Sequence, residues 1–565
     1  MKYSIRSLII FSFFILFLFF ILIYIGILQL YFFSYYKEKS IANYTRFEKI
    51  EGLRGIITDC NNIPIAITKP IFKLIWKKHP KKLNTLDIKL LKFLEEVYQK
   101  KISINEINSD SSESIIIHDN VSFEELSLFL ENFPNSERIS IQHILQRHYP
   151  HKELFCHAIG YINKQKDALF GLEKSYNDLL IGKEGLIENR VNAKGEIINN
   201  NFLISPEEGG MINTTLDFYL QKIIFDCFPQ NESGCVIIVD PINGEVKSLF
   251  SSPTFDPHIF QNRIDSTLWK ELQNNKILIN RSFQALYAPG SIYKLIIALA
   301  LLEEKIITNN TKWFCSGFLE YKGRKYHCNK KQGHGLISIN EAISHSCNIP
   351  FYLESIKNLS IDSIYKYATS FGLGKKTGIA LSELEGLIPN KTWKKKKYGE
   401  KWYTGETLSI AIGQGATTVT PIQMTQIIMG IMQGYIIPPY ILQKDKKEKI
   451  YLPYKKENLQ IIKDNMKKSA KKGSSKALAD LKNWEIYAKT GTVQVCSLDK
   501  LNTQKNDIAG VEKNSNHHGF FVSWAKYKNE KPIIAVFIIE NNGSSRHTVE
   551  IAKNFFTECE RNYYS

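Results

Sequence analysis

The chain has 565 residues, 44% of them hydrophobic, and this length suggests two or three folded domains rather than one. Its formal net charge of +17 comes from lysines and arginines that are scattered along the chain, without a nucleic-acid-binding motif around them. We therefore expect no nucleic acid as a partner, and we attribute the charge to a surface facing anionic material or to compositional drift.

The N-terminus carries an apolar run of membrane-spanning length. Residues 8–33 are almost wholly Ile, Leu and Phe without charge, and such a run crosses about 30 Å of hydrocarbon. Lys2 and Arg6 precede it, so the positive-inside rule keeps residues 1–7 in the cytoplasm and exports the rest. A cleaved signal peptide would have a shorter apolar region ending in small residues, whereas this run ends in Phe32-Phe33. We expect a retained single-pass anchor.

Residues 34–210 alternate short strand-like runs, such as 55–59 and 114–118, with polar stretches. One segment, 87–100, has apolar residues near one face of a helix. Because no nucleophile–base set stands out, we expect a spacer or binding module here.

A second domain is expected from 211 to 565. After a short strand and a helix, a hairpin turns at 240–244, long helical patterns follow, and the chain returns to strands beyond a polar loop at about 496–517. Strands at both ends with helices between them predict an antiparallel sheet whose first and last strands meet. The expected strands are 235–239, 245–250, 485–488, 519–524 and 533–539.

Nine cysteines, an odd count in a chain of this length, do not form a dense disulfide framework. Six are isolated and are interpreted as small buried apolar residues: Cys60, Cys156, Cys227, Cys235, Cys496 and Cys559.

The segment 287–294 carries a candidate nucleophile. Pro289-Gly290 predicts a turn, so Ser291 opens a helix and Lys294 lies one turn on, on the same face. A serine is a poor nucleophile until a base takes its proton, and this spacing brings an amine within reach. The helix N-terminus adds a favourable field and N–H groups for a developing oxyanion. The segment therefore predicts acyl transfer.

The same tetrapeptide occurs again at Ser363–Lys366, and a Lys-Thr-Gly triplet follows at 376–378. Ser363 lacks the Pro-Gly turn and lies in 362–371, where apolar positions predict an ordinary packed helix. Two motifs so close in sequence can hardly face each other from a helix and a sheet edge. We assign both to structure.

Three motifs stand in order at wide separation: Ser291-x-x-Lys294, Ser346-Cys347-Asn348 and Lys489-Thr490-Gly491-Thr492. This set resembles the active-site signature of penicillin-binding proteins and serine β-lactamases. Further phrases resemble the class B penicillin-binding proteins over most of the chain: 54–59, 157–161, 171–173, 240–245, 255–257, 280–281, 412–415 and 420–423.

Within class B, two features resemble the penicillin-binding protein 2 group, the elongation transpeptidases. One is the phrase 402–407 before Gly413-Gln414-Gly415, and the other is the long loop that starts with Val493-Gln494-Val495. Glu406 stands where the family usually has Asp, and Ala488 stands where Gly is common. Neither change removes a reacting group.

The resemblance implies that Ser291 attacks the penultimate D-alanyl carbonyl of a donor stem peptide, with Lys294 as the general base. Ser346 would relay a proton to the leaving D-alanine, and the backbone N–H groups of Ser291 and Thr492 would form the oxyanion hole. A free lysine has a pKa of about 10.4. Burial of Lys294 beside Lys489 is expected to lower that pKa, by desolvation and by like charge.

The other matched residues are implied to bind the substrate. Asn348 would hydrogen-bond the substrate backbone, and Lys489 would add positive potential. Thr490 and Thr492, on either side of Gly491, would hold the terminal carboxylate.

Cys315, Cys328, His334 and Cys347 form the pattern C-x12-C-x5-H-x12-C around the approach to Ser346. Four thiolate and imidazole ligands suit a closed structural zinc site. The spacings are not those of a zinc finger, so a Cys315–Cys328 disulfide or unrelated buried residues stay as alternatives. The resemblance favours the metal, because penicillin-binding protein 2 of Gram-negative bacteria carries a metal site in this segment. Zinc would then support the catalytic geometry, and no organic cofactor is expected.

Several alternatives share parts of this pattern. A β-lactamase needs a water-activating base, and no Glu-x-x-Leu-Asn segment lies between the second and third motifs. The class B phrases argue against a D,D-carboxypeptidase, and a β-lactam sensor would usually show extra spans and a signalling module. A scaffold without activity would have lost one of the motifs. A division-specific class B transpeptidase is the nearest alternative.

The resemblance and the patterns together predict an α+β protein with a transmembrane helix, a mixed α/β pedestal domain at 34–210 and a transpeptidase domain at 211–565. Its implied function is that of a peptidoglycan D,D-transpeptidase of cell-wall elongation, inhibited by β-lactams. It would lie in the inner membrane with its catalytic domain in the periplasm. Its implied partners are stem peptides ending in D-Ala-D-Ala, a RodA-type glycosyltransferase and an MreC-type scaffold.

Overall fold

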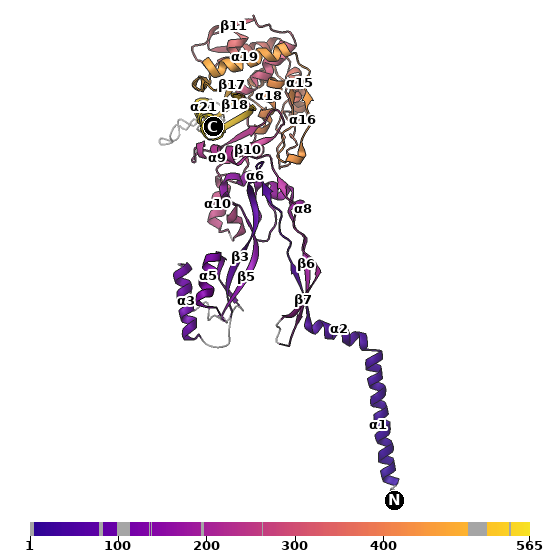
Figure 1. Cartoon of the computed structure of the whole chain (residues 1–565). Helices are drawn as coiled ribbons and strands as arrows, with labels where there is room; N and C mark the ends of the chain where they lie inside the picture. The colour runs from indigo at the N-terminus through magenta and orange to yellow at the C-terminus, as the bar shows by residue number, and fades with distance from the viewer. Residues whose placement is uncertain are drawn as a thin grey trace, which may run out of the picture. The chain divides into compact units, whose positions relative to one another are not determined.

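The computed structural model describes residues 5–77, 83–98, 114–134, 136, 138–193, 197–262, 264–494, 517–541 and 544–564. Contacts divide the chain into two compact units, 1–55 with 181–210, and 56–180 with 211–565 (Figure 1). The predicted pedestal segment 34–210 therefore contributes to both units. Most of the predicted loop at 496–517, with Cys496, lies outside the described residues.

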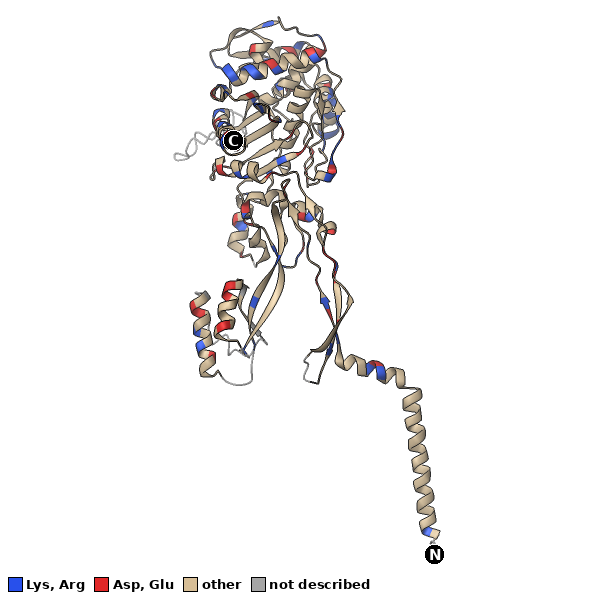
Figure 2. Ribbon diagram, viewed as in Figure 1, with Lys and Arg blue, Asp and Glu red and all other residues tan. Residues whose placement is uncertain are grey.

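The first unit begins with α1, Ile5–Leu30, which is long and apolar enough by length and composition to cross a membrane. None of its side chains is buried, and Arg6 is its one charged residue; the ribbon of α1 is therefore tan along almost all of its length in Figure 2. A second helix and an antiparallel sheet in the order β1-β6-β7 complete the unit. The bounds are α2 Phe33–Tyr44, β1 Thr45–Ile50, β6 Gly185–Val191 and β7 Ile197–Ile204.

The second unit contains a smaller sheet built around one long strand, β3, Pro64–Lys77, which pairs with β2, β4 and β5. Two helices pack against it through a core that includes Leu74, Trp76, Leu94 and Phe129. The helix predicted at 87–100 is the first of these, and its last two predicted residues lie outside the described part. The bounds are β2 Ile57–Thr58, β4 Ser114–Val121, β5 Ile139–His148, α3 Thr85–Tyr98 and α5 Phe123–Asn132.

Short elements connect this sheet to the larger domain. Strand β8, Ile212–Asn213, pairs in parallel with β2. The others are η1 Lys152–Phe155, α6 Cys156–Ile159, α7 Gly171–Ser175 and α8 Asn177–Leu180.

The larger sheet has five antiparallel strands in the order β10-β9-β19-β18-β17. The chain enters through the hairpin β9–β10, and its last strand β19 pairs with β9, so the predicted meeting of first and last strands is confirmed. The bounds are β9 Gly234–Val239, β10 Val246–Ser252, β17 Trp484–Gln494, β18 His517–Tyr527 and β19 Ile533–Ile539.

Both faces of this sheet are buried, which explains why its strands are continuous apolar runs. In β9, Cys235 and Ile237 face one hydrophobic core, whereas Val236 and Ile238 face a second. The first core includes α12 and α18, and the second includes α9 and α21 (Figure 1). The bounds are α9 Phe218–Cys227, α12 Lys294–Glu303, α18 Pro421–Gln433 and α21 Ser545–Asn562. The predicted α+β fold is confirmed.

Most of the remaining elements pack on the first core, whereas η2 and α10 form a separate small core with Tyr161 and Phe255, and η5 packs on the second core. The helices are η2 Pro257–Gln261, α10 Ser266–Asn274, α11 Arg281–Gln284, η3 Gly290–Ile292, α13 Ile339–Ser344, α14 Ile349–Lys357, α15 Ile361–Ser370, α16 Lys391–Tyr398, α17 Thr404–Ala411, η4 Gln443–Asp445, α19 Lys456–Lys472 and η5 Lys476–Leu478. The strands are β11 Lys312–Cys315, β12 Phe318–Tyr321, β13 Arg324–His327, β14 Gly335–Ser338, β15 Tyr435–Ile436 and β16 Ile450–Tyr451.

Candidate active site

The candidate nucleophile lies in the 3₁₀ turn η3, directly before α12, rather than in the first turn of one continuous α-helix. The turn is closed by the Tyr293 N–H, which donates to the Gly290 carbonyl at 3.0 Å. Gly290 and Gly413 both have positive φ, and the Gly290 N–H donates to the Gly413 carbonyl at 2.8 Å. A Cβ on Gly413 would lie 2.2 Å from the Gly290 oxygen, so only glycine fits there.

Ser291 is partly exposed, and within the described part of the chain its hydroxyl takes part in no hydrogen bond. Its backbone nitrogen faces β17, because a Cβ at Gly491 would lie 3.6 Å from it. Lys294 is fully buried one turn later, and its ammonium group bonds to the second motif instead of to Ser291. Catalytic hydrogen bonds are often formed only when substrate is bound.

The second motif forms the turn between α13 and α14. Ser346 has a φ of +59°, which is uncommon for a residue other than glycine. In this conformation its carbonyl accepts a hydrogen bond from Lys294 Nζ at 2.9 Å, and its hydroxyl lies 3.5 Å from the same nitrogen. Lys294 also donates to Asn348 Oδ1, and Asn348 Nδ2 donates to the His327 carbonyl at 2.9 Å. The second motif is thus tied to the first through one lysine.

The third motif lies on β17. Lys489 is fully buried and donates to the Ser346 hydroxyl at 2.8 Å and to the Thr490 carbonyl at 3.0 Å. The Ser346 hydroxyl therefore lies between two lysines, Lys294 and Lys489. The structure brings the three predicted motifs together at one place.

The two lysines have strongly perturbed electrostatics. Burial lowers the pKa of Lys294 to about 8, against the opposing effect of Cys347 and Cys328. Burial also lowers the pKa of Lys489 well below its ordinary value, and the positive charge of Lys294 adds to that effect. Desolvation lowers the pKa of Lys294, as predicted. The predicted effect of like charge instead lowers the pKa of Lys489. Both groups favour their neutral, basic form more than a free lysine does.

The two threonines of the third motif differ in exposure. Thr492 is exposed, whereas Thr490 is buried and donates its hydroxyl hydrogen to Ser474 Oγ at 2.6 Å. Ser474 itself is exposed, and its N–H lies 3.3 Å from the Ser344 carbonyl at the end of α13. The sequence analysis did not include Ser474, because a Gly-Ser-Ser turn after a long helix matches no catalytic motif. The glycine that precedes Ser474 was the one local feature that pointed to a turn here.

The four candidate metal ligands converge. The ligand atoms of Cys315, Cys328, His334 and Cys347 all lie within 4.8 Å of one another. His334 Nδ1 lies 3.6 Å from Cys315 Sγ and 3.5 Å from Cys328 Sγ, and the Sγ atoms of Cys328 and Cys347 are 3.6 Å apart. A tetrahedral zinc site requires separations of about 3.6 Å for S···N and about 3.8 Å for S···S. The thiols are free, and the hydrogen bond between Cys328 and Cys347 lowers the pKa of Cys328.

The repeated motifs lie elsewhere. Ser363 belongs to the first turn of α15, where its N–H bonds to Ser360 Oγ at 3.0 Å, and Lys366 is exposed. Thr377 donates its N–H at 2.8 Å and its hydroxyl at 3.1 Å to Glu383 Oε2. Both segments thus make local hydrogen bonds, and neither is among the contacts of the Ser346 hydroxyl.

Two family models match the chain. The penicillin-binding protein transpeptidase domain matches residues 234–557, which is more than half of the chain, and the penicillin-binding protein dimerisation domain matches residues 49–214.

Individual relatives match along nearly the whole length. The peptidoglycan D,D-transpeptidase MrdA of Escherichia coli strain K12 is 28% identical over 92% of this chain and 88% of its own length. The protein of the same name from Acinetobacter baumannii is 29% identical over 94% of this chain and 83% of its own. Among solved structures, the penicillin-binding protein PBP2 of Helicobacter pylori in complex with MreC is similar, with a TM-score of 0.74 and 26% identity. That match covers 92% of this chain and 99% of the other.

Proposed function

The chain belongs to the family of penicillin-binding protein transpeptidases, and on this premise we propose that it is a peptidoglycan D,D-transpeptidase that cross-links stem peptides in cell-wall elongation. The observation that carries the proposal is the convergence of Lys294 and Lys489 on the Ser346 hydroxyl beside the turn that bears Ser291. Relatives named MrdA support elongation over the division alternative.

In the proposed mechanism, Ser291 Oγ forms a bond to the penultimate D-alanyl carbonyl carbon while Lys294 takes its proton. Lys294 then protonates the Ser346 hydroxyl as that hydroxyl gives its own proton to the leaving amine. The peptide C–N bond breaks, the terminal D-alanine leaves, and an acyl ester on Ser291 remains. An acceptor amine then forms a bond to the ester carbonyl carbon and loses a proton to Lys294. The ester C–O bond breaks, and Ser291 Oγ takes that proton from Lys294.

Substrate binding uses the exposed edge of β17. The N–H groups of Ser291 and Thr492 would bind the developing oxyanion, where loss of one donor costs about 3–4 kcal/mol in comparable enzymes. Thr492, with Thr490 behind it, would hold the terminal carboxylate, and Lys489 supplies positive potential. Asn348 would contact the substrate backbone, and for this it would exchange its hydrogen bond to the His327 carbonyl for one to the substrate.

Purified full-length protein tests this proposal. With a donor stem peptide ending in D-Ala-D-Ala and an acceptor amine, we expect release of D-alanine and formation of the cross-linked product. Release of D-alanine with water as the only acceptor would indicate a carboxypeptidase instead. In cells, depletion should produce rounding, and filamentation would favour the division alternative.

The location and partners follow from the same proposal. Helix α1 would anchor the chain in the inner membrane and hold the catalytic domain in the periplasm. A solved relative is a complex of PBP2 with MreC, and a second is a peptidoglycan synthase complex, with a TM-score of 0.76 and 24% identity. By analogy, an MreC-type scaffold and a RodA-type glycosyltransferase are the proposed partners, and β-lactams the inhibitors.

Zinc is the proposed structural metal. Cys315, Cys328, His334 and Cys347 fit a tetrahedral ion by donor type and by separation, and Cys347 would connect the ion to the Ser346 turn. Elemental analysis should find about one zinc per chain in the wild type and clearly less in Cys328→Ser. The control is Cys227→Ser, which changes a cysteine outside the cluster and should keep its zinc. Metal-free protein with a Cys315–Cys328 cross-link would overturn this assignment.

A further inference from the structure

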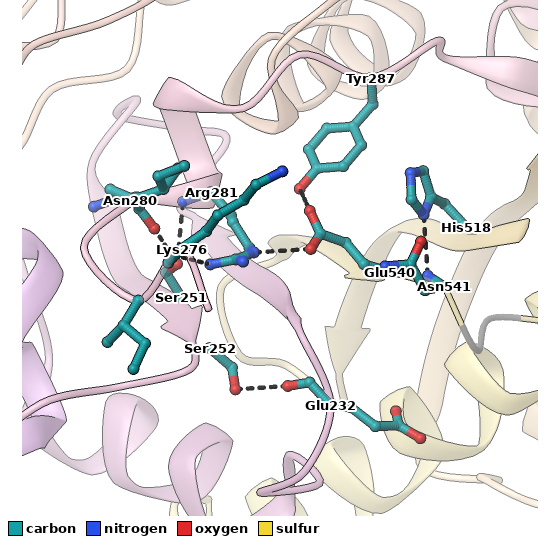
Figure 3. A network of polar contacts seen from close by, with 12 residues as sticks. Glu232, Ser251, Ser252, Lys276, Asn280, Arg281, Tyr287, His518, Glu540 and Asn541 are labelled. Carbon is teal, nitrogen blue, oxygen red and sulfur yellow. Dashed lines mark hydrogen bonds and ion pairs between the residues drawn. The ribbon is translucent and has the colours of Figure 1, made fainter. Parts of the chain in front are cut away.

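The phrase Asn280-Arg281 lies shortly before the nucleophile turn and outside the three motifs. Arg281 is almost fully buried, with 3% of its surface exposed. Its N–H donates to Ser251 Oγ at 3.0 Å, Nη1 donates to the Lys276 carbonyl at 3.2 Å, and Nε donates to Glu540 Oε2 at 3.0 Å (Figure 3). These three hydrogen bonds hold Arg281 in one place, with Glu540 as its counter-ion.

Glu540 follows the last residue of the central strand β19. Its other carboxylate oxygen, Oε1, accepts a hydrogen bond from the Tyr287 hydroxyl at 2.7 Å (Figure 3). Strand register relates this position to the active site: Ile539 pairs with Gly519, and Gly519 pairs with Thr492. The carboxylate thus lies at the same end of the sheet as the substrate-binding edge of β17.

Tyr287 begins the segment that carries Ser291. It exchanges backbone hydrogen bonds with Val419, both at 2.9 Å, and its ring packs edge-on against His518 at 5.6 Å. Burial and the nearby negative groups raise the pKa of Tyr287 well above its ordinary value, which keeps the phenol protonated as a donor. The segment is therefore held at Tyr287 by Glu540 and at Gly290 by Gly413.

We propose that Glu540 is a positioning residue for the nucleophile: through Tyr287 its carboxylate determines where the Ser291 hydroxyl stands relative to Lys294 and β17. Arg281 holds the carboxylate at the right distance. Loss of the Tyr287–Glu540 or the Arg281–Glu540 contact would let the turn that bears Ser291 shift by a fraction of an ångström. No reacting group would be removed. Misplacement of about 1 Å can reduce a reaction rate by about a hundredfold. This inference rests on the proposed acyl-enzyme chemistry, but not on the elongation role.

The test measures acylation of the purified full-length protein by a fluorescent penicillin, with the dissociation constant of the initial complex separated from the acylation rate constant. We expect Tyr287→Phe and Glu540→Ala to lower the rate constant about tenfold and to leave the dissociation constant within about twofold. Glu540→Gln, which can still accept from Tyr287, should recover part of the rate. The double variant should be no slower than Glu540→Ala alone, because both changes remove one contact.

Glu232→Gln is the matched control. Glu232 is a glutamate of similar burial whose carboxylate pairs with His547 rather than with Tyr287 or Arg281. It should acylate at the wild-type rate. Wild-type rate constants in folded Tyr287→Phe and Glu540→Ala would overturn the inference, as would a loss that appears only in the dissociation constant. Should Glu540→Ala not fold, Tyr287→Phe decides alone. A wild type that is not acylated would contradict the proposed function instead.

Discussion

At the scale of single residues, the site is defined by two buried ammonium groups without a counter-ion. In the described part of the chain no carboxylate pairs with Lys294 or Lys489, and both use hydroxyl, carbonyl and amide oxygens as acceptors. Burial of an unpaired charge costs several kcal/mol, so the neutral amine is more populated than in a free lysine. The same arrangement that destabilises the charged lysines supplies a base near neutral pH.

Replacement of the proposed base tests its role. Lys294→Ala should reduce acylation by a labelled penicillin by at least about a thousandfold, because Ser291 loses its proton acceptor. The measurement is the labelling rate, with circular dichroism to show that the protein is folded. Lys366→Ala, in the repeated tetrapeptide on α15, is the matched control and should label normally. Normal labelling of Lys294→Ala would rule out the assignment.

The lowered pKa of Lys294 predicts a pH dependence. Only the neutral amine accepts a proton, so the acylation rate should rise with pH and level off above about 8. At pH 7 roughly a tenth of Lys294 would be neutral, compared with less than a thousandth for a free lysine. The measurement is the acylation rate constant between pH 6 and 9.5. A rate that keeps rising to pH 9.5 or that does not change would contradict the prediction.

At the scale of elements, the site depends on contacts between segments that are distant in sequence. Strand β17, the α13–α14 turn and the turn η3 each contribute one motif, and Gly413 contacts Gly290 from a fourth segment. The same is true outside the site. In the smaller sheet of the second unit, Arg147 on β5 donates to Glu173 on α7 at 2.7 Å, and both side chains are almost fully buried.

This buried pair predicts a large effect on stability. Glu173→Gln removes the carboxylate charge that pairs with the buried Arg147, and we expect the free energy of unfolding to fall by about 3 kcal/mol. Chemical denaturation of the purified protein measures it. Glu184→Gln, in an exposed pair with Lys49, should change the free energy of unfolding far less, because solvent screens that pair. Equal effects of the two changes would contradict the importance of burial.

At the scale of the whole molecule, the chain combines an apolar helix without buried side chains, α1, with a domain that has two dense cores. Within the described residues no side chain of α1 is buried, and its length suits the hydrocarbon core of a bilayer, which is about 30 Å thick. The three motifs all lie in the second compact unit, so the chemistry is expected to be independent of the anchor.

A truncation tests this separation. Removal of residues 1–33 should move the protein from the membrane fraction to the supernatant, while labelling by penicillin stays within about twofold of the full-length rate. Fractionation at high salt and at alkaline pH, followed by labelling, measures both properties. A truncated protein that stays with the membrane would show that other segments also bind lipid or a membrane partner.

Local patterns in the sequence predicted a large part of this protein. The membrane-spanning run, the hairpin, the strands at both ends of the second domain and the order of the three motifs all depend on apolar periodicity and turn residues, which act over a few neighbours. The Pro289-Gly290 turn also distinguished Ser291, as the candidate nucleophile, from Ser363 in the repeated tetrapeptide. These features follow from the chain alone.

Tertiary structure decided which groups meet. The hydrogen bond from Lys489 to Ser346 joins residues 143 positions apart, and the bond from Tyr287 to Glu540 joins residues 253 apart. No local propensity encodes such pairs, because they depend on how the sheet and helices pack. For the same reason Ser474 and Glu540 were missed, the left-handed Ser346 was not expected, and the convergence of Cys315, Cys328, His334 and Cys347 became visible only in the fold.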